Sequence, residues 1–122
     1  MAKPVVLVVE DNPMSRATAV EIFEDLGFAV FDAYNGHHTL ALLEAHPEID
    51  LLFIDVRMPG MSGSELAKAV RRRRPGIRIV LTSGYVGEED VPEGFTFVPK
   101  PWRMDQVARA VGLRGSNQST AL

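Results

Sequence analysis

Cysteine is absent from this 122-residue sequence. Its absence excludes disulfide frameworks, thiolate zinc sites, iron–sulfur clusters and cysteine nucleophiles. Long apolar runs are also missing, since the run near the start of the chain extends only from Val5 to Val9. A membrane-spanning helix needs about 20 apolar residues, and this run also lacks the features of a secretory signal peptide. We therefore expect a cytoplasmic protein without a membrane partner.

The sequence also has little net charge, because 13 basic residues oppose 16 acidic ones and leave a formal charge of −3. Domains that bind nucleic acid are usually basic overall, so we expect no direct contact with nucleic acid. The length fits one domain, which we assign to residues 3–113, followed by a small and polar flexible tail at residues 114–122. The tail is too short to be an effector, so the output of a chain that ended here would depend on contacts with other proteins.

Short apolar segments alternate with segments of helical periodicity along the chain. The pattern predicts strands at residues 5–9, 28–33, 50–55, 77–81 and 95–98, and helices at residues 13–26, 37–45, 64–74 and 101–113. Several strands are apolar throughout, as in sheets that are covered on both faces. The sequence therefore predicts an α/β fold with a doubly wound, five-stranded parallel sheet.

Polar residues follow the predicted strands at their carboxyl ends. They are Glu10 and Asp11 after the first strand, Asp55 at the end of the third, Thr82 and Ser83 after the fourth, and Lys100 after the fifth. A parallel sheet brings these positions to one edge, where ligands usually bind. Three neighbouring carboxylates would raise one another's pKa, and a hard cation such as Mg²⁺ removes that conflict. With a lysine and a hydroxyl, they form the parts of a phosphoryl-transfer site.

Each of these residues also has a simpler interpretation. Asp11 or Asn12 could cap the helix that begins at Pro13, and Asp55 could cap the turn after its strand. Lys100 could be a solvated cation in a loop. If each residue had only its separate role, all of them would have to lie at the same edge of the sheet by coincidence. A common site is the more probable explanation.

Four stretches carry a resemblance to a known family. They are Val8-Val9-Glu10-Asp11-Asn12, Ile54-Asp55-Val56-Arg57-Met58-Pro59-Gly60-Met61-Ser62-Gly63, Leu81-Thr82-Ser83-Gly84-Tyr85 and Val98-Pro99-Lys100-Pro101-Trp102. The chain resembles a response-regulator receiver domain of two-component or phosphorelay signalling, of the type attached to or serving hybrid histidine kinases. The resemblance implies the flavodoxin-like topology of receivers and a sensor kinase, hybrid histidine kinase or histidine phosphotransfer protein as partner.

The resemblance also implies roles for individual residues. Asp55 would be the phosphoacceptor, taking a phosphoryl group from a phosphohistidine. Asp11 and Asp55 would ligate Mg²⁺ together with the backbone carbonyl of Arg57, and Glu10 would hold the cation through water. Lys100 would pair with the phosphoryl oxygens, and the bond between Lys100 and Pro101 would be cis.

The resemblance leaves the switch hydroxyl open between Ser83 and Thr82. We favour Ser83, because Gly84 after it leaves space beside the phosphoryl group. Neighbouring strand residues point to opposite faces, so only one of the two hydroxyls would face Asp55. Phe97, three residues before Lys100, occupies the position of the family's aromatic switch residue, and it is otherwise an ordinary core aromatic.

One segment departs from the family pattern. Residues 83–94 are shorter than usual and contain Gly84, Gly87, Pro92 and Gly94 among four acidic residues. We expect a shortened or missing fourth helix there, and a segment that becomes ordered on phosphorylation or on docking.

The leading hypothesis is a signalling switch, rather than an enzyme, that catalyses its own phosphorylation and dephosphorylation at Asp55. A degenerate receiver that only binds partners is an alternative. An aspartyl-phosphate phosphatase would need a second carboxylate two residues after the nucleophile, where this chain has Arg57. A flavin-binding electron carrier would need a first loop that cradles phosphate, and Glu10 with Asp11 would repel it.

Overall fold

The computed structural model describes residues 3–84 and 94–112. Its strands are β1 (Val5–Val9), β2 (Ala29–Ala33), β3 (Leu51–Asp55), β4 (Arg78–Ser83) and β5 (Thr96–Pro99). Its helices are α1 (Pro13–Asp25), α2 (Gly36–Ala45), α3 (Gly63–Arg73) and α4 (Met104–Ala110). The predicted alternation of strands and helices is confirmed.

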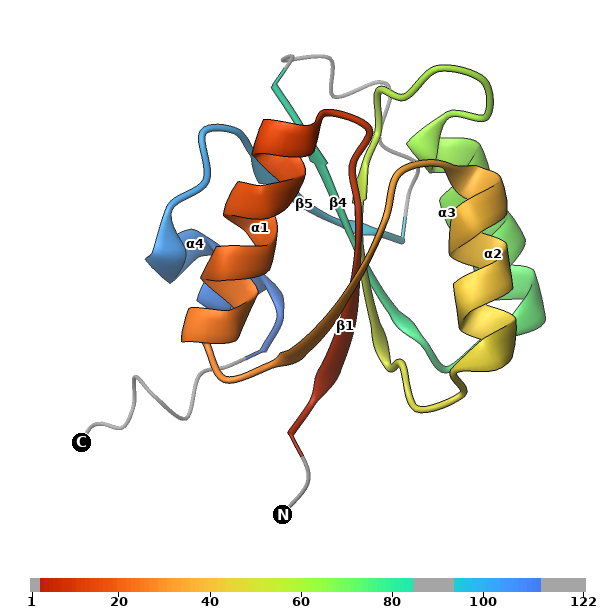
Figure 1. Cartoon of the computed structure of the whole chain (residues 1–122), viewed down its shortest axis with the longest axis horizontal. Coiled ribbons are helices and arrows are strands. Elements are labelled where there is room, and N and C mark those ends of the chain that lie inside the picture. Colours follow the sequence, from red (N-terminus) through yellow and green to blue (C-terminus); the bar gives the residue numbers. More distant parts are fainter. Residues whose placement is uncertain (1–2, 85–93, 113–122) are drawn as a thin grey trace.

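The five strands form one parallel sheet in the order β2-β1-β3-β4-β5. Helices α1 and α4 cover one face of the sheet, and α2 and α3 cover the other (Figure 1). The order in which the chain adds strands to the sheet reverses direction between β1 and β3, and ligands bind at this point in sheets of this kind. This confirms the predicted doubly wound parallel fold and places the carboxyl ends of β1 and β3 side by side.

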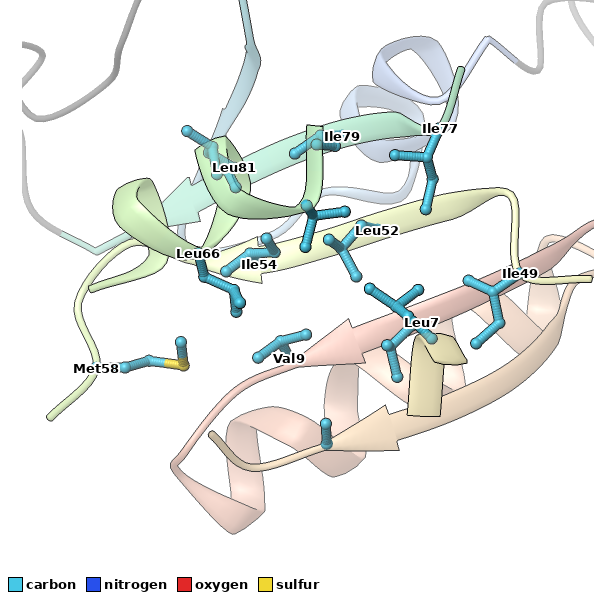
Figure 2. Packing of buried hydrophobic residues seen from close by; sticks show 14 of the residues in the cluster. Leu7, Val9, Ile49, Leu52, Ile54, Met58, Leu66, Ile77, Ile79 and Leu81 are labelled. Atoms are coloured by element: carbon cyan, nitrogen blue, oxygen red, sulfur yellow. The ribbon is translucent and has the colours of Figure 1, made fainter. Parts of the chain in front are cut away.

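The alternation of side chains along the strands creates two separate cores. On the α2–α3 face, Leu7, Leu52, Ile54 and Leu81 pack with Leu66 of α3 and the other residues of that cluster (Figure 2). On the α1–α4 face, a second cluster contains Val6, Val8, Phe23, Phe53, Val80, Val98 and Val107. The central strand β3 is buried along its whole length because it contributes to both clusters. This rigid sheet fixes the positions of the residues that follow its strands.

Side-chain caps set the starts of three helices. Asn12 accepts a hydrogen bond from the Ser15 amide and caps α1, with Pro13 at the first helical position. Asn35 caps α2 in the same way, so that helix begins at Gly36, one residue before the predicted start. Ser62 and Glu65 form a capping box at α3. Of the two predicted caps for α1, Asn12 is therefore the correct one, and Asp11 keeps its carboxylate available.

The last helix was predicted too long. It extends from Met104 to Ala110, because Arg103 is extended and Gly112 adopts a positive φ of 83°. The fourth strand was predicted too short, since pairing of Asp55 with Thr82 and of Ser83 with Pro99 extends β4 to Ser83. The predicted loss of a fourth helix falls on residues 85–93, which lie outside the described residues.

Arg74 ties the far ends of α2 and α3 together. Its guanidinium donates to the backbone carbonyls of Leu43, Pro47 and Ile49. These carbonyls lie at the C-terminus of α2 and in the turn that leads into β3, where no helix partner satisfies them.

Within residues 3–84 and 94–112, no helix is both long and apolar enough to cross a lipid bilayer.

Candidate functional site

Three carboxylates meet where β1 and β3 end. Oxygen atoms of Glu10, Asp11 and Asp55 all lie within 4.8 Å of one another. Glu10 and Asp55 are only 2% and 4% exposed, whereas Asp11 is exposed. The register of the sheet causes this meeting, because β1 pairs with β3 so that Val9 lies beside Ile54 and both strands end at the same level. The predicted acidic group is therefore assembled as expected.

Lys100 enters this group from the end of β5. Its Nζ donates to Glu10 Oε1 and to Asp55 Oδ2, at 2.8 Å in each case. The backbone amide of Lys100 donates to the Ser83 carbonyl at 3.0 Å, which fixes the residue to the end of β4. The bond between Lys100 and Pro101 is cis, as predicted. The lysine therefore lies between two buried carboxylates, and it is not a solvated loop cation.

The balance of charge in the site favours retention of one proton. Burial raises the pKa of Glu10 from 4.5 to about 7; the bond from Lys100 opposes this shift, and the neighbouring Asp55 adds to it. Burial alone would lower the pKa of Lys100, but the bonds to Asp55 and Glu10 outweigh it and raise that pKa. One ammonium thus neutralises one of the two buried carboxylates, and the second ionises only near neutral pH.

Backbone amides orient the two buried carboxylates. The Asn12 amide donates to Glu10 Oε2 at 3.1 Å, and the Arg57 amide donates to Asp55 Oδ1 at 2.9 Å. The second bond shows that Asp55 also caps the turn after β3, which was the simpler interpretation of this residue. The two interpretations of Asp55 are compatible, because Oδ1 accepts from the turn while Oδ2 contacts Lys100.

The donor set fits a hard divalent cation. Carboxylate oxygens are the ligands that Mg²⁺ prefers, and it is usually held by one or two carboxylates with several waters. Glu10, Asp11 and Asp55 offer such oxygens within 4.8 Å of one another, and Asp11 opens the group to solvent. The residues that are present therefore fit Mg²⁺.

The two candidate hydroxyls lie on opposite faces of β4. Thr82 is paired with Asp55 in the register of the sheet, and its Oγ1 accepts a hydrogen bond of 2.7 Å from Trp102 Nε1. Ser83 is buried on the other face, one position nearer to the carboxyl edge. Phe97 shares that face, is paired with Leu81 and packs against the α2–α3 core. The hydroxyl of Thr82 is therefore engaged by the indole, while Ser83 and Phe97 lie on the same side.

Sequence reasoning missed three residues that support the site. Gly63 packs so closely on β3 that an added Cβ would lie 2.1 Å from the Asp55 carbonyl oxygen. Arg16 donates to the Glu10 carbonyl at 2.9 Å and pairs with Asp32 at 3.2 Å. Trp102 packs against the cluster that contains Val107 of the last helix, and its indole also reaches Thr82. For Gly63, its position at the start of a helix was a signal in the sequence. The contacts of Arg16 and Trp102 depend on tertiary packing, so the sequence held no signal for them.

The assembled site can perform one kind of chemistry well. It presents the buried carboxylate of Asp55 within an acidic group, an ammonium beside it and a hydroxyl at the neighbouring strand end. These are a nucleophile and the groups that stabilise charge on a transferred phosphoryl group. Arg57 occupies the position where a phosphatase of this type would need a second carboxylate.

Comparisons with known proteins agree with this geometry. The sequence model of the response regulator receiver domain matches residues 6–112. The sensor kinase CckA of Brucella abortus is 33% identical over 112 residues, which cover 87% of this chain and 12% of the kinase. Sporulation initiation phosphotransferase F of Bacillus subtilis is 30% identical over 112 residues, which cover 87% of this chain and 89% of that protein.

The fold has close structural counterparts as well. A response regulator receiver protein from Pseudomonas putida superimposes with a TM-score of 0.84 at 28% sequence identity, covering 93% of this chain and 98% of that one. The chain spans 10% to 25% of the length of several curated relatives that it matches. In those relatives the matching region is therefore one part of a larger protein.

Proposed function

The chain belongs to the response regulator receiver family, and on this premise we propose that it is a phosphoacceptor switch in a two-component phosphorelay. Asp55 takes a phosphoryl group from a phosphohistidine on a sensor kinase, hybrid histidine kinase or histidine phosphotransfer protein. The signal then passes on by contact with another protein or by onward transfer. We assign this activity to residues 3–113, and the exchange takes place in the cytoplasm, where such kinases present their phosphohistidine.

The placement of Lys100 carries the proposal. Its Nζ lies 2.8 Å from Asp55 Oδ2, the oxygen that does not accept from the Arg57 amide. An ammonium at this position stabilises the negative charge on a phosphoryl group that arrives at Asp55. An Asp55 oxygen forms a bond to phosphorus, the bond between phosphorus and the histidine nitrogen breaks, and the neutral imidazole leaves with a proton from solvent. Lys100 then pairs with the phosphoryl oxygens.

The acidic group holds the cation that this transfer uses. Asp11 and Asp55 would bind Mg²⁺ directly with the backbone carbonyl of Arg57, and Glu10 would contact it through water. When bound, the cation supplies positive charge that offsets the phosphoryl oxygens. Glu10 should give up its retained proton when the cation is bound, because a nearby positive charge lowers the pKa of a carboxyl group.

The switch hydroxyl is Ser83 in this proposal. The Thr82 hydroxyl is already bonded to Trp102, and Ser83 lies nearer to the carboxyl edge on the face of Phe97. Ser83 would donate to a phosphoryl oxygen, and Phe97 would shift as the hydroxyl moves. Ser83→Ala should slow phosphorylation by at least about tenfold, the worth of one hydrogen bond to a charged group. A larger loss in Thr82→Val would instead identify Thr82 as the switch hydroxyl.

The test is phosphorylation of the purified chain by a small acyl phosphate with Mg²⁺, followed by intact mass measurement. We expect a single phosphoryl adduct that is absent in Asp55→Asn and absent when Mg²⁺ is chelated. Asp50→Asn is the matched control, because Asp50 precedes the same strand at its opposite end and is exposed. Its adduct should equal that of the parent.

Two results would contradict the proposal. A folded parent that takes no phosphoryl group from any acyl phosphate or phosphoramidate would indicate a degenerate receiver that only binds partners. An adduct that persists in Asp55→Asn would place the acceptor elsewhere.

A further inference from the structure

Trp102 lies between β5 and α4 and contacts the residue beside Asp55. Its indole Nε1 donates to Thr82 Oγ1 at 2.7 Å, and Thr82 is only 1% exposed. Thr82 is the register partner of Asp55, and its backbone carbonyl accepts from the Val56 amide at 2.8 Å. The indole bond therefore ends on the residue that is hydrogen bonded to the chain immediately after Asp55.

The ring of Trp102 also lies against the lysine of the site. Lys100 Nζ is 5.3 Å from the ring centroid, within the range of a cation–π contact. The ring of Phe53 packs on the same indole in an edge-type contact, with a centroid distance of 5.6 Å. The indole is thus held by Thr82 and Phe53 and presents a face to the ammonium that contacts Asp55.

We propose that Trp102 is a positioning residue for phosphoryl transfer: its hydrogen bond to Thr82 fixes the indole so that Lys100 stays directed at Asp55. This inference rests on the function proposed above. In this role Trp102 and Thr82 act through Lys100, and neither residue contacts the phosphoryl group.

The physical reason is the freedom of a lysine side chain. Lysine has a flexible four-carbon stem and a compact charge, so its ammonium is held in place only by what surrounds it. Glu10 and Asp55 hold the ammonium from one side, but both also face the cation site. The indole contacts the ammonium from a residue outside the acidic group. It therefore keeps Lys100 in place when the carboxylates are engaged by the cation.

The alternative is that Trp102 only fills the α1–α4 core. Its contact with Phe53 would serve that purpose with any aromatic ring. The hydrogen bond to Thr82 distinguishes the two roles, because Trp102→Phe retains the ring but removes the N–H, and Thr82→Val retains the buried shape but removes the acceptor.

The experiment compares phosphorylation rates by acyl phosphate in the parent, Trp102→Phe, Thr82→Val and the double variant. We expect each single variant to be about two- to tenfold slower at saturating Mg²⁺, the range that corresponds to one neutral hydrogen bond. The double variant should be no slower than either single one, because both remove the same bond. The Mg²⁺ concentration that gives half the maximal rate should not rise, since neither residue is a ligand.

Thr39→Val is the matched control. Thr39 is also fully buried, and its hydroxyl donates to the Asn35 carbonyl at 2.8 Å, away from the site. Its rate, corrected for the folded fraction, should equal that of the parent. Trp102 is the only tryptophan in the sequence, so its indole N–H gives one NMR signal. That signal should exchange slowly with solvent in the parent and faster in Thr82→Val.

The possible failures are distinguishable. A parent that accepts no phosphoryl group overturns the proposed function, and this inference with it. A parent that is phosphorylated while Trp102→Phe reacts at the same rate overturns the positioning role alone. A loss confined to Thr82→Val also overturns it, because Thr82 would then act directly. An equal loss in Thr39→Val would show a general effect of stability. If Trp102→Phe does not fold, Thr82→Val and the indole signal still decide the outcome.

Discussion

Glu10→Gln should stabilise the protein at alkaline pH in the absence of divalent cations. The side chain is 2% exposed and shares one ammonium with Asp55, and burial raises its pKa from 4.5 to about 7. The native state therefore holds this proton more tightly than the unfolded chain does. The stability that this proton brings is intact below about pH 4.5 and is lost as the pH rises through about 7.

The size of the effect follows from the pKa shift. A rise from 4.5 to about 7 corresponds to about 3 kcal/mol of unfolding free energy. Glutamine resembles the protonated acid and carries no such pH dependence. The variant and the parent should therefore be equally stable near pH 4.5, and the variant should be more stable by about 3 kcal/mol above pH 8.

Urea unfolding followed by circular dichroism, in chelator at several pH values, measures this difference. Glu21→Gln is the control, because Glu21 is an exposed glutamate on α1. Its stability should follow that of the parent at every pH. The reasoning is refuted if Glu10→Gln is the less stable protein at pH 8, or if its difference from the parent does not change with pH.

Three further predictions concern the cation and the supports of the site. Below pH 7, Mg²⁺ binding should release close to one proton, measured by calorimetry in buffers of different ionisation enthalpy, and Glu10→Gln should abolish that release. Gly63→Ala should lower the unfolding free energy by about 1–3 kcal/mol in urea titrations, because its Cβ would collide with β3, whereas Gly76→Ala meets nothing within 4 Å. Arg74→Ala should cost about 1–3 kcal/mol in thermal unfolding because it leaves three backbone carbonyls, two of them partly buried, without their donor, and exposed Arg72→Ala should cost little.

Each of these predictions has a contradicting result. Unchanged proton release in Glu10→Gln would assign the proton to another group. Equal stability of Gly63→Ala and Gly76→Ala would mean that α3 can move away from β3. Equal losses in Arg74→Ala and Arg72→Ala would attribute the effect to charge rather than to hydrogen bonds.

Local sequence patterns were sufficient for most of the fold. The apolar run from Val5 to Val9 and the segment ending at Asp55 are strands in which every side chain except that of Val5 is buried on one face or the other. The meeting of Glu10, Asp55 and Lys100 followed from the rule that parallel strands end at one edge. These features depend on periodicity and topology, which a single sequence records.

Other features depended on contacts between distant segments. Nothing near Trp102 in the chain indicates that its indole reaches Thr82, 20 positions earlier. The extension of β4 to Ser83 required pairing with two neighbouring strands. The pKa of Glu10 depends on how deeply it is buried and on how many carboxylates share one lysine. Such quantities arise only when the tertiary structure is assembled.

The alternation of side chains on β4 has a consequence for how the protein can diversify. Thr82 and Ser83 are neighbours in sequence, yet Thr82 joins the α1–α4 layer and Ser83 lies on the face of α2 and α3. Two adjacent residues at the edge of the site therefore belong to the two opposite helical layers of the protein. A partner that binds the α1–α4 side would therefore meet the site through Thr82 and Trp102, and a partner that binds the α2–α3 side would meet it through Ser83.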